Sequence, residues 1–122
     1  MATEIDFALL TFDVTSRDSY EQIRSFRREV ADASEKQVAA GRNEILCVLV
    51  ACKCDLVDAR AVTFEEAAAL AGALDCVAYV ETSAKTGINC GLPFQEALYA
   101  DELRTFHRPP KVGAKSHINK KG

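Results

Sequence analysis

Three apolar runs of strand length dominate the pattern of hydrophobic and polar positions. They cover residues 5–13, 45–51 and 76–80, are rich in Val, Leu, Ala and Phe, and show little polar alternation. Runs of this kind are typical of strands that are buried on both faces. The pattern therefore predicts three buried strands.

The segment after the first run predicts a helix. Its apolar positions recur at three- and four-residue steps and would form one packing face, made of Tyr20, Ile23, Phe26 and Val30. Ser16 or Ser19 is suited to cap the start of this helix. Residues 31–42 are polar and rich in Ala, so we expect the helix to end there in a loop that contains Gly41.

Two further helices are expected after the second and third runs. A Thr-Phe-Glu-Glu capping box at residues 63–66 would open an Ala-rich helix, with Gly72 near its end. The last helix spans about residues 91–106 and tolerates Pro93 in its first turn. Its packing face would consist of Phe94, Ala97 and Leu98.

Strands and helices therefore alternate three times along the chain. This order predicts an α/β fold of three layers, with a mainly parallel sheet and helices on both faces. Ligands in such sheets bind beyond the carboxyl ends of the strands. The loops after the second and third strands, residues 52–56 and 83–89, should lie side by side at that rim. We expect one domain over residues 1–106 and a disordered tail over residues 107–122.

The net charge of −3 is distributed unevenly along the chain. Residues 107–122 contain five Lys or Arg residues and no acid, so this tail carries +5 and the remainder −8 by difference. An acidic body argues against nucleic-acid binding. The basic tail is either a solvated extension or a weak contact for anionic lipids.

Cysteine usage and hydropathy indicate the compartment. No apolar run is long enough to span a bilayer and no secretion signal is visible, so we expect a cytoplasmic protein. The cysteine count of five is odd, which predicts free thiols in this setting. Cys52 and Cys54 are too close for the usual zinc pair, and no further ligands follow at a suitable spacing, so we expect no metal site.

Three polar stretches follow apolar ones in a recognisable order. Residues 48–56 read VLVACKCDL and end in a Lys-x-Asp loop, residues 81–87 read ETSAKTG, and residues 12–20 read FDVTSRDSY. Together they resemble motifs of the Ras-like small GTPases, the Rab and Ras branches in particular. The resemblance implies a partial G domain of the P-loop NTPase fold. It also implies a switch that binds GTP or GDP in signalling or vesicle trafficking.

By this resemblance, Asp55 reads the edge of guanine. Its carboxylate would accept hydrogen bonds from N1–H and the exocyclic amine, a donor pair that adenine lacks. The backbone N–H of Ala84 would donate to O6 of the base, and Ser83 would brace the loop. Outside the family context, Asp55 is equally suited to an ordinary turn and Ser83 to a local cap.

Lys53, Lys85 and Cys52 complete the implied guanine site. Lys53 would lay its methylene stem along the base and tie the loop down, and Lys85 would cover the other face; the alternative for Lys85 is a solvated charge. Cys52 stands where the family has Asn. Since a thiol is a poor donor and a poor acceptor, this is the point at which the site departs from the family pattern.

The phosphate-binding and catalytic motifs of the family do not occur in the sequence. It contains neither a Gly-x-x-x-x-Gly-Lys-Ser/Thr loop nor an Asp-x-x-Gly turn. No residue can be nominated as the switch Thr, as a ligand of the family's Mg²⁺ or as a catalytic residue. The sequence corresponds to the rear half of the family's domain, so we expect neither tight GTP binding nor hydrolysis by this chain alone. Enzyme activity in a longer protein stays open.

The missing front half has consequences for association. In the family, the strand that begins at Ile5 has a neighbour that is absent here, and an exposed sheet edge invites self-association. The last cysteine is Cys90, so we find no prenylation motif. Regulator and effector proteins are implied as partners. Two alternatives remain: a degenerate, non-enzymatic interaction module with the G-domain fold, and an unrelated α/β nucleotide-binding domain.

Overall fold

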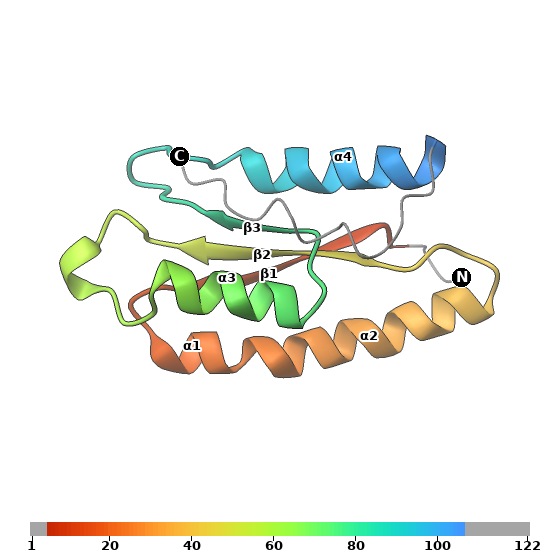
Figure 1. The fold of residues 1–122 in the computed structure, drawn as a ribbon, viewed down its shortest axis with the longest axis horizontal. Helices are drawn as coiled ribbons and strands as arrows, with labels where there is room; N and C mark the ends of the chain where they lie inside the picture. The colour runs from red at the N-terminus through yellow and green to blue at the C-terminus, as the bar shows by residue number, and fades with distance from the viewer. Residues whose placement is uncertain (1–4, 107–122) are drawn as a thin grey trace.

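A three-stranded parallel sheet forms the centre of the molecule (Figure 1). The computed structural model describes residues 5–106. The strands are β1 (Phe7–Asp13), β2 (Leu46–Cys52) and β3 (Ala78–Glu81), and their order in the sheet is β1-β2-β3. Asp13 is in register with Cys52, and Ala51 with Glu81. The carboxyl ends of all three strands therefore meet at one rim.

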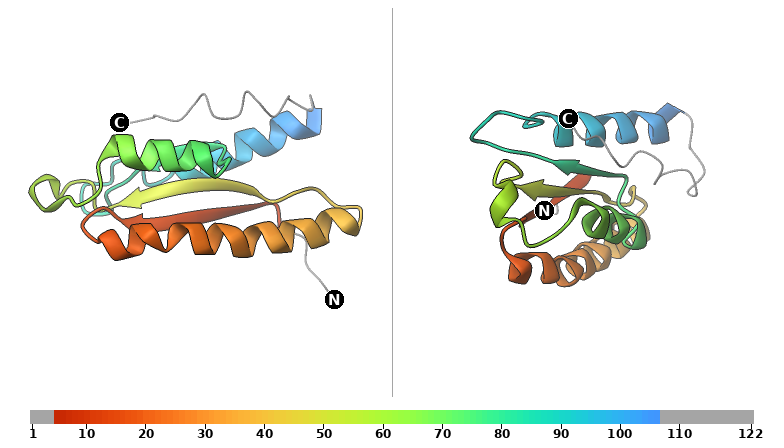
Figure 2. Two further views of the ribbon diagram at one scale, coloured as in Figure 1. Left: turned by 60° about the horizontal axis from the view of Figure 1, so that its bottom comes forward. Right: turned by 60° about the vertical axis from the view of Figure 1, so that its left-hand side comes forward.

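Helices cover both faces of this sheet (Figure 2). α1 (Arg17–Glu21), α2 (Ile23–Ala39) and α3 (Phe64–Ala73) lie on one face, and α4 (Leu92–Phe106) packs on β2 and β3 from the other. Each face has its own buried cluster, with Leu10, Phe12 and Leu49 in the first and Val48, Val50 and Ala97 in the second. The expected three-layer α/β fold is confirmed, and burial on both faces explains why the strands read as continuous apolar runs.

The helix ends follow local sequence chemistry. The Ser16 side chain accepts a hydrogen bond from the Ser19 N–H and caps α1. The box at residues 63–66 is confirmed: Thr63 Oγ1 accepts from the Glu66 N–H, and the Glu66 carboxylate accepts from the Thr63 N–H. α2 ends at Ala39 with Ala40 as its C-cap, and Gly41 follows with a φ of +84°, which suits glycine; the N–H of Arg42 donates to the Gln37 carbonyl at 2.9 Å.

Two of the expected packing faces are wrong in part. On α2, the inward side follows Ile23, Arg27 and Val30, and Phe26 lies on the flank with 42% of its surface exposed. The single expected helix is also divided at Gln22, which caps both α1 and α2. Tyr20, Ile23 and Val30 of the expected face nevertheless pack on one buried cluster, so only Phe26 departs from it.

The packing face of α4 is rotated by about one residue from the expected one. Ala97 is fully buried and Pro93 lies in the first turn, both as expected, and Pro93 is also buried. Phe94 and Leu98 are 53% and 54% exposed. α4 packs chiefly on β2 and β3, so its flank toward β1 is only partly covered. Hydropathy alone cannot show which part of a sheet face is uncovered.

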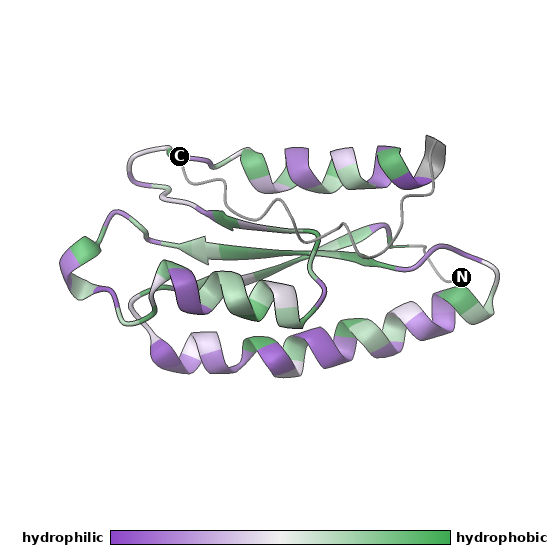
Figure 3. Ribbon diagram, viewed as in Figure 1, coloured by the Kyte–Doolittle hydropathy of each residue, from purple (hydrophilic) through white to green (hydrophobic). Residues whose placement is uncertain are grey.

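Element boundaries differ slightly from the expected ones. β1 begins at Phe7 rather than Ile5, and β3 spans 78–81 rather than 76–80. A short 3₁₀ helix, η1 (Val57–Ala59), interrupts the loop after β2. Figure 3 shows the hydrophobic residues concentrated on the strands, whereas α1 and α2 carry hydrophilic residues along most of their length. No helix within residues 5–106 has the length and apolar character that a membrane crossing needs.

β1 is an edge strand within the described part of the chain. The Asp6 carbonyl and the Val14 N–H bond to β2, at 3.1 Å each. Residues of a parallel strand direct their backbone groups alternately to either side. Phe7, Leu9 and Thr11 therefore direct theirs away from β2, toward the free edge.

Candidate functional site at the carboxyl rim of the sheet

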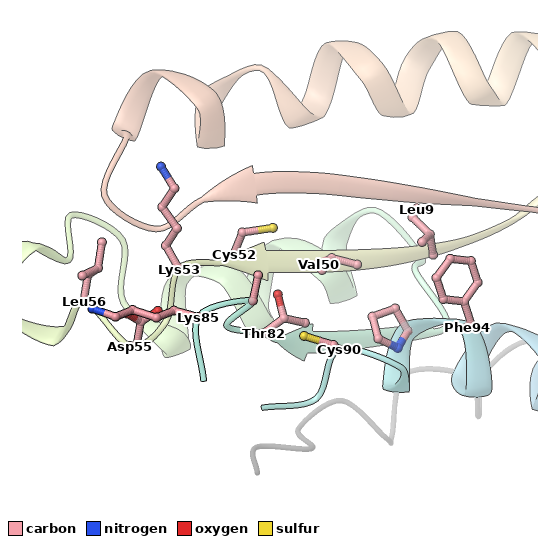
Figure 4. A pocket seen from close by; sticks show the side chains of 12 residues that line it. Leu9, Val50, Cys52, Lys53, Asp55, Leu56, Thr82, Lys85, Cys90 and Phe94 are labelled. Carbon is pink, nitrogen blue, oxygen red and sulfur yellow. The ribbon is translucent and has the colours of Figure 1, made fainter. Parts of the chain in front are cut away.

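An open pocket of about 540 Å³ lies at the carboxyl rim, between the loops after β2 and β3 and the start of α4 (Figure 4). Its lining combines apolar residues of the sheet and α4 with polar loop residues: Leu9, Val50, Cys52, Lys53, Asp55, Leu56, Thr82, Ala84, Lys85, Cys90, Pro93 and Phe94. Five of the six residues expected in a guanine site line this pocket. The sixth, Ser83, lies directly behind it.

Asp55 and Ser83 join the two loops. The Ser83 hydroxyl, only 1% exposed as a residue, donates to Asp55 Oδ1 at 2.7 Å. The same oxygen of Ser83 accepts from the Thr86 N–H at 3.2 Å. A backbone bond from the Cys54 N–H to the Thr82 carbonyl, at 3.0 Å, adds a second link. Within residues 5–106, nothing is bonded to Asp55 Oδ2, so that oxygen is available to a ligand.

Ala84 follows in a tight loop that returns on itself. The Ser83 N–H donates to the Ile88 carbonyl, and the Gly87 N–H donates to the Ser83 carbonyl at 2.8 Å, with Gly87 at a φ of +78°. No acceptor for the Ala84 N–H lies among the described residues. Ala84 and Lys85 are exposed at the mouth of the pocket. The loop therefore offers the Ala84 N–H as a donor and the Lys85 ammonium group as a cation to a ligand in the pocket.

Lys53 has an unusual backbone, and its side chain pairs with Asp13. Its φ is +65°, in the left-handed region that side chains other than glycine rarely adopt. Lys53 Nζ lies 2.9 Å from Asp13 Oδ2 at the end of β1. Hydrogen bonds from Thr15, with a further contribution from Lys53, lower the pKa of Asp13 to about 2. The contact with Asp13 raises the pKa of Lys53.

The cysteines near the rim are unpaired thiols, as are the other two. Cys52 ends β2 and lines the pocket, and its sulfur makes no hydrogen bond within the described residues. Burial raises the pKa of the Cys54 thiol to about 11. Across residues 5–106 there is no group of three or more His, Cys, Asp or Glu side chains that could hold a metal ion.

A buried network behind the pocket supports both loops. Arg60, in the loop after β2, forms a bidentate ion pair with Glu81 at the end of β3, and Tyr79 donates to the same carboxylate at 2.6 Å. The ion pair raises the pKa of Arg60. The Glu81 carbonyl accepts from Asn89 Nδ2 at 2.9 Å, which anchors the loop after β3. Glu81 thus holds one loop by its side chain and the other by its backbone.

Several of these residues were not indicated by the sequence pattern. Asp13 ends the first strand, and the expected meeting of strand ends at one rim was a signal that could have found it. Arg60 carried no such signal, because its partner Glu81 is 21 residues away and the pairing depends on the fold. In the apolar half of the pocket, Val50 is buried as expected for the second strand, whereas Leu9 and Phe94 were expected to be covered and are partly or largely exposed.

Comparisons with known proteins agree with the rim motifs. The sequence model of the Ras family matches residues 1–102. Mouse Ras-related protein Rab-42 is 38% identical over 130 residues, which cover 93% of this chain and 57% of that protein. Human Rab-42 is 40% identical over 103 residues (79% and 44%), and bovine Ras-related protein Rab-19 is 35% identical over 106 residues (87% and 45%). The chain spans about half the length of these relatives. The chain belongs to the Ras family of small GTPases, and the relatives named here are Rab proteins.

Proposed function

We propose that this chain is the guanine-recognising part of a Ras-family GTPase and that its rim pocket binds the base of GTP or GDP. The observation that carries the proposal is the position of two groups. The Asp55 carboxylate and the Ala84 N–H come from two loops that the Ser83–Asp55 hydrogen bond joins across 28 residues of sequence, and Asp55 and Ala84 both line one pocket.

These two groups match the donor and acceptor pattern of guanine. Asp55 Oδ2 can accept from N1–H and the exocyclic amine, while Oδ1 stays bonded to Ser83. The Ala84 N–H can donate to O6. Adenine has no N1–H and carries an amine where guanine has O6, so the same groups would reject it. The stems of Lys53 and Lys85 would lie against the two faces of the base.

The free energies of the expected hydrogen bonds predict that the chain alone binds guanine nucleotides weakly. A hydrogen bond to a charged group contributes about 1.5–3 kcal/mol, whereas association costs on the order of 4–15 kcal/mol. Base contacts alone therefore predict a dissociation constant in the range of about 1 mM. The described residues offer no cluster that fits Mg²⁺, and no phosphate loop occurs in the sequence. GTP hydrolysis, and any regulator or effector proteins, would then belong to a longer protein.

The experiment that tests this proposal exchanges the base specificity. Xanthosine monophosphate carries a carbonyl where GMP carries the exocyclic amine, and the amide of an Asn can donate to that carbonyl. In Asp55→Asn we expect the ratio of GMP to XMP affinity to fall by at least about tenfold, because a charge-assisted hydrogen bond is lost. Affinities are measured by calorimetry at millimolar nucleotide, with AMP as the reference base.

Asp58→Asn is the matched control, since Asp58 is a neighbouring exposed acid of η1 that does not line the pocket. It should keep the wild-type ratio. An unchanged ratio in Asp55→Asn would remove Asp55 from the site. Equal binding of GMP and AMP by the wild type would favour the alternative, a non-enzymatic interaction module with the G-domain fold.

A further inference from the structure

We infer that Asp13 is a positioning residue for the proposed base site, because it holds the Lys53 side chain across the rim from β2 to β1. The inference rests on the proposed function for its ligand. Its geometric part concerns only Lys53 and Asp13, whose charged groups are 2.9 Å apart. Asp13 is the last residue of β1, and Lys53 directly follows the last residue of the neighbouring strand β2. Both therefore lie at the same rim as the pocket.

Lys53 needs an anchor if its stem is to form one wall of the pocket. Its side chain is 59% exposed, and a long exposed Lys side chain samples many rotamers when nothing holds its ammonium group. Its backbone is already set by the left-handed φ and by the Leu56 N–H, which donates to the Lys53 carbonyl at 3.0 Å. The side-chain direction is therefore the remaining freedom, and the ion pair removes it.

Contacts with Thr15 and Ser19, independent of Lys53, hold Asp13 in place. Its N–H donates to Ser19 Oγ at 3.0 Å. Its Oδ1 accepts from both the N–H and the hydroxyl of Thr15, at 2.8 and 2.7 Å. Oδ2 is left for Lys53, and the Asp13 side chain is only 26% exposed. The start of α1 thus determines where the carboxylate points.

The ion pair also divides the roles of the two lysines. In Figure 4 the Lys53 side chain runs from the end of β2 toward the loop after β1, whereas Lys85 lies beside Asp55. Because Asp13 neutralises the ammonium group of Lys53, this residue offers its methylene stem to a base. Lys85 then remains the free cation at the mouth of the pocket.

The first arm of the test needs no ligand. Methylene protons of a fixed Lys side chain give separate NMR signals, and those of a mobile one average. We expect separate Lys53 signals in the wild type, averaged signals in Asp13→Asn, and wild-type signals in Glu66→Gln. The last variant is the matched control: it removes the carboxylate of the Arg17–Glu66 ion pair, neither of whose residues lines the pocket, and a Gln keeps the capping box. Identical Lys53 signals in the wild type and Asp13→Asn would overturn the inference.

The second arm is a double-mutant cycle on the affinity for GMP. We expect Asp13→Asn to weaken binding about 3- to 10-fold when Lys53 is present and to have no effect in Lys53→Met, since coupled residues are not additive. Equal weakening in both backgrounds would overturn the positioning role even if the base site is correct. Absence of GMP binding by the wild type up to about 10 mM, with separate Lys53 methylene signals, would instead refute the proposed function.

If Asp13→Asn does not fold, Thr15→Val replaces it. That change removes the Thr15 hydroxyl that donates to the Asp13 carboxylate and leaves the charge of Asp13 in place.

Discussion

At the scale of single residues, Cys52 is where the proposed base site departs most from the family pattern. It ends β2 and lines the pocket, and its thiol makes no hydrogen bond within the part of the chain that the structure describes. An Asn at this position would offer both a donor and an acceptor to the base and the neighbouring loop. We therefore expect Cys52 to limit the affinity of the proposed site without changing the fold.

Cys52→Asn should accordingly strengthen GMP binding. One additional hydrogen bond contributes about 0.5–1.5 kcal/mol, which corresponds to roughly a 2- to 10-fold lower dissociation constant. Calorimetry with GMP measures this change. Cys90→Ser is the control, because Cys90 also lines the pocket but lies in the exposed loop before α4. Weaker binding by Cys52→Asn would show that the base does not approach this end of β2.

The site residues differ in how far the sequence could predict them. Asp55, Ser83 and Ala84 lie in the short polar stretches that follow apolar runs, so their place at the rim follows from a parallel sheet alone. Asp13 and Arg60 act through partners that are distant in sequence, and the fold must be known before either pair can be named. The left-handed backbone of Lys53 could not be predicted, because glycine rather than lysine is the usual residue there.

At the scale of elements, the Arg60–Glu81 pair joins the loop after β2 to β3. Its side chains are 19% and 10% exposed. Removing one member of a buried ion pair leaves an uncompensated charge and costs about 3–5 kcal/mol. We expect Arg60→Ala to lower the free energy of unfolding by this amount, as measured by urea denaturation. The side chains of the Arg17–Glu66 pair are 45% and 38% exposed. Arg17→Ala should therefore lower the free energy of unfolding by at most about 1 kcal/mol. Similar losses in the two variants would contradict a buried network.

Two carboxylates that join elements make stability depend on pH. Hydrogen bonds from Thr15 and Lys53 lower the pKa of Asp13, and those from Arg17 and Thr63 lower the pKa of Glu66, each to about 2. A carboxyl group whose pKa is lowered by folding stabilises the folded state fully above its ordinary pKa, about 4. That contribution is lost as the pH falls through about 2. We expect the urea midpoint to decrease between pH 5 and pH 2.5, and to decrease less in Glu66→Gln. A midpoint that is constant over this range would contradict these contacts.

The elements themselves were largely predictable, and their faces were not. Burial on both sides gives the strands continuous apolar runs, and the capping box marks the start of α3 whatever packs on it. The exposed positions of Phe94 and Leu98 depend on which strands α4 covers. That information lies in the assembled sheet and not in the helix sequence.

At the scale of the whole molecule, the free edge of β1 predicts self-association. Within residues 5–106, Phe7, Leu9 and Thr11 direct their backbone groups away from β2 with no strand beside them, and Phe94, which lines the pocket together with Leu9, exposes apolar surface. Sedimentation velocity should show a mass that rises above that of one chain as concentration increases. Thr11→Lys should reduce this association, because a charged side chain on an edge strand disfavours pairing with a strand of another chain. Ser25→Lys, on the exposed side of α2, should not. A single-chain mass at every concentration would contradict an accessible edge.

The central claim is that Asp55 and Ala84 recognise the edge of guanine together. Titration of ¹⁵N-labelled protein with GMP, followed by two-dimensional NMR, tests it most directly. We predict a saturable downfield shift of the Ala84 amide at millimolar GMP, which AMP does not produce and which is lost in Asp55→Asn. An Ala84 amide that stays in place with GMP, or moves equally with AMP, would contradict the claim.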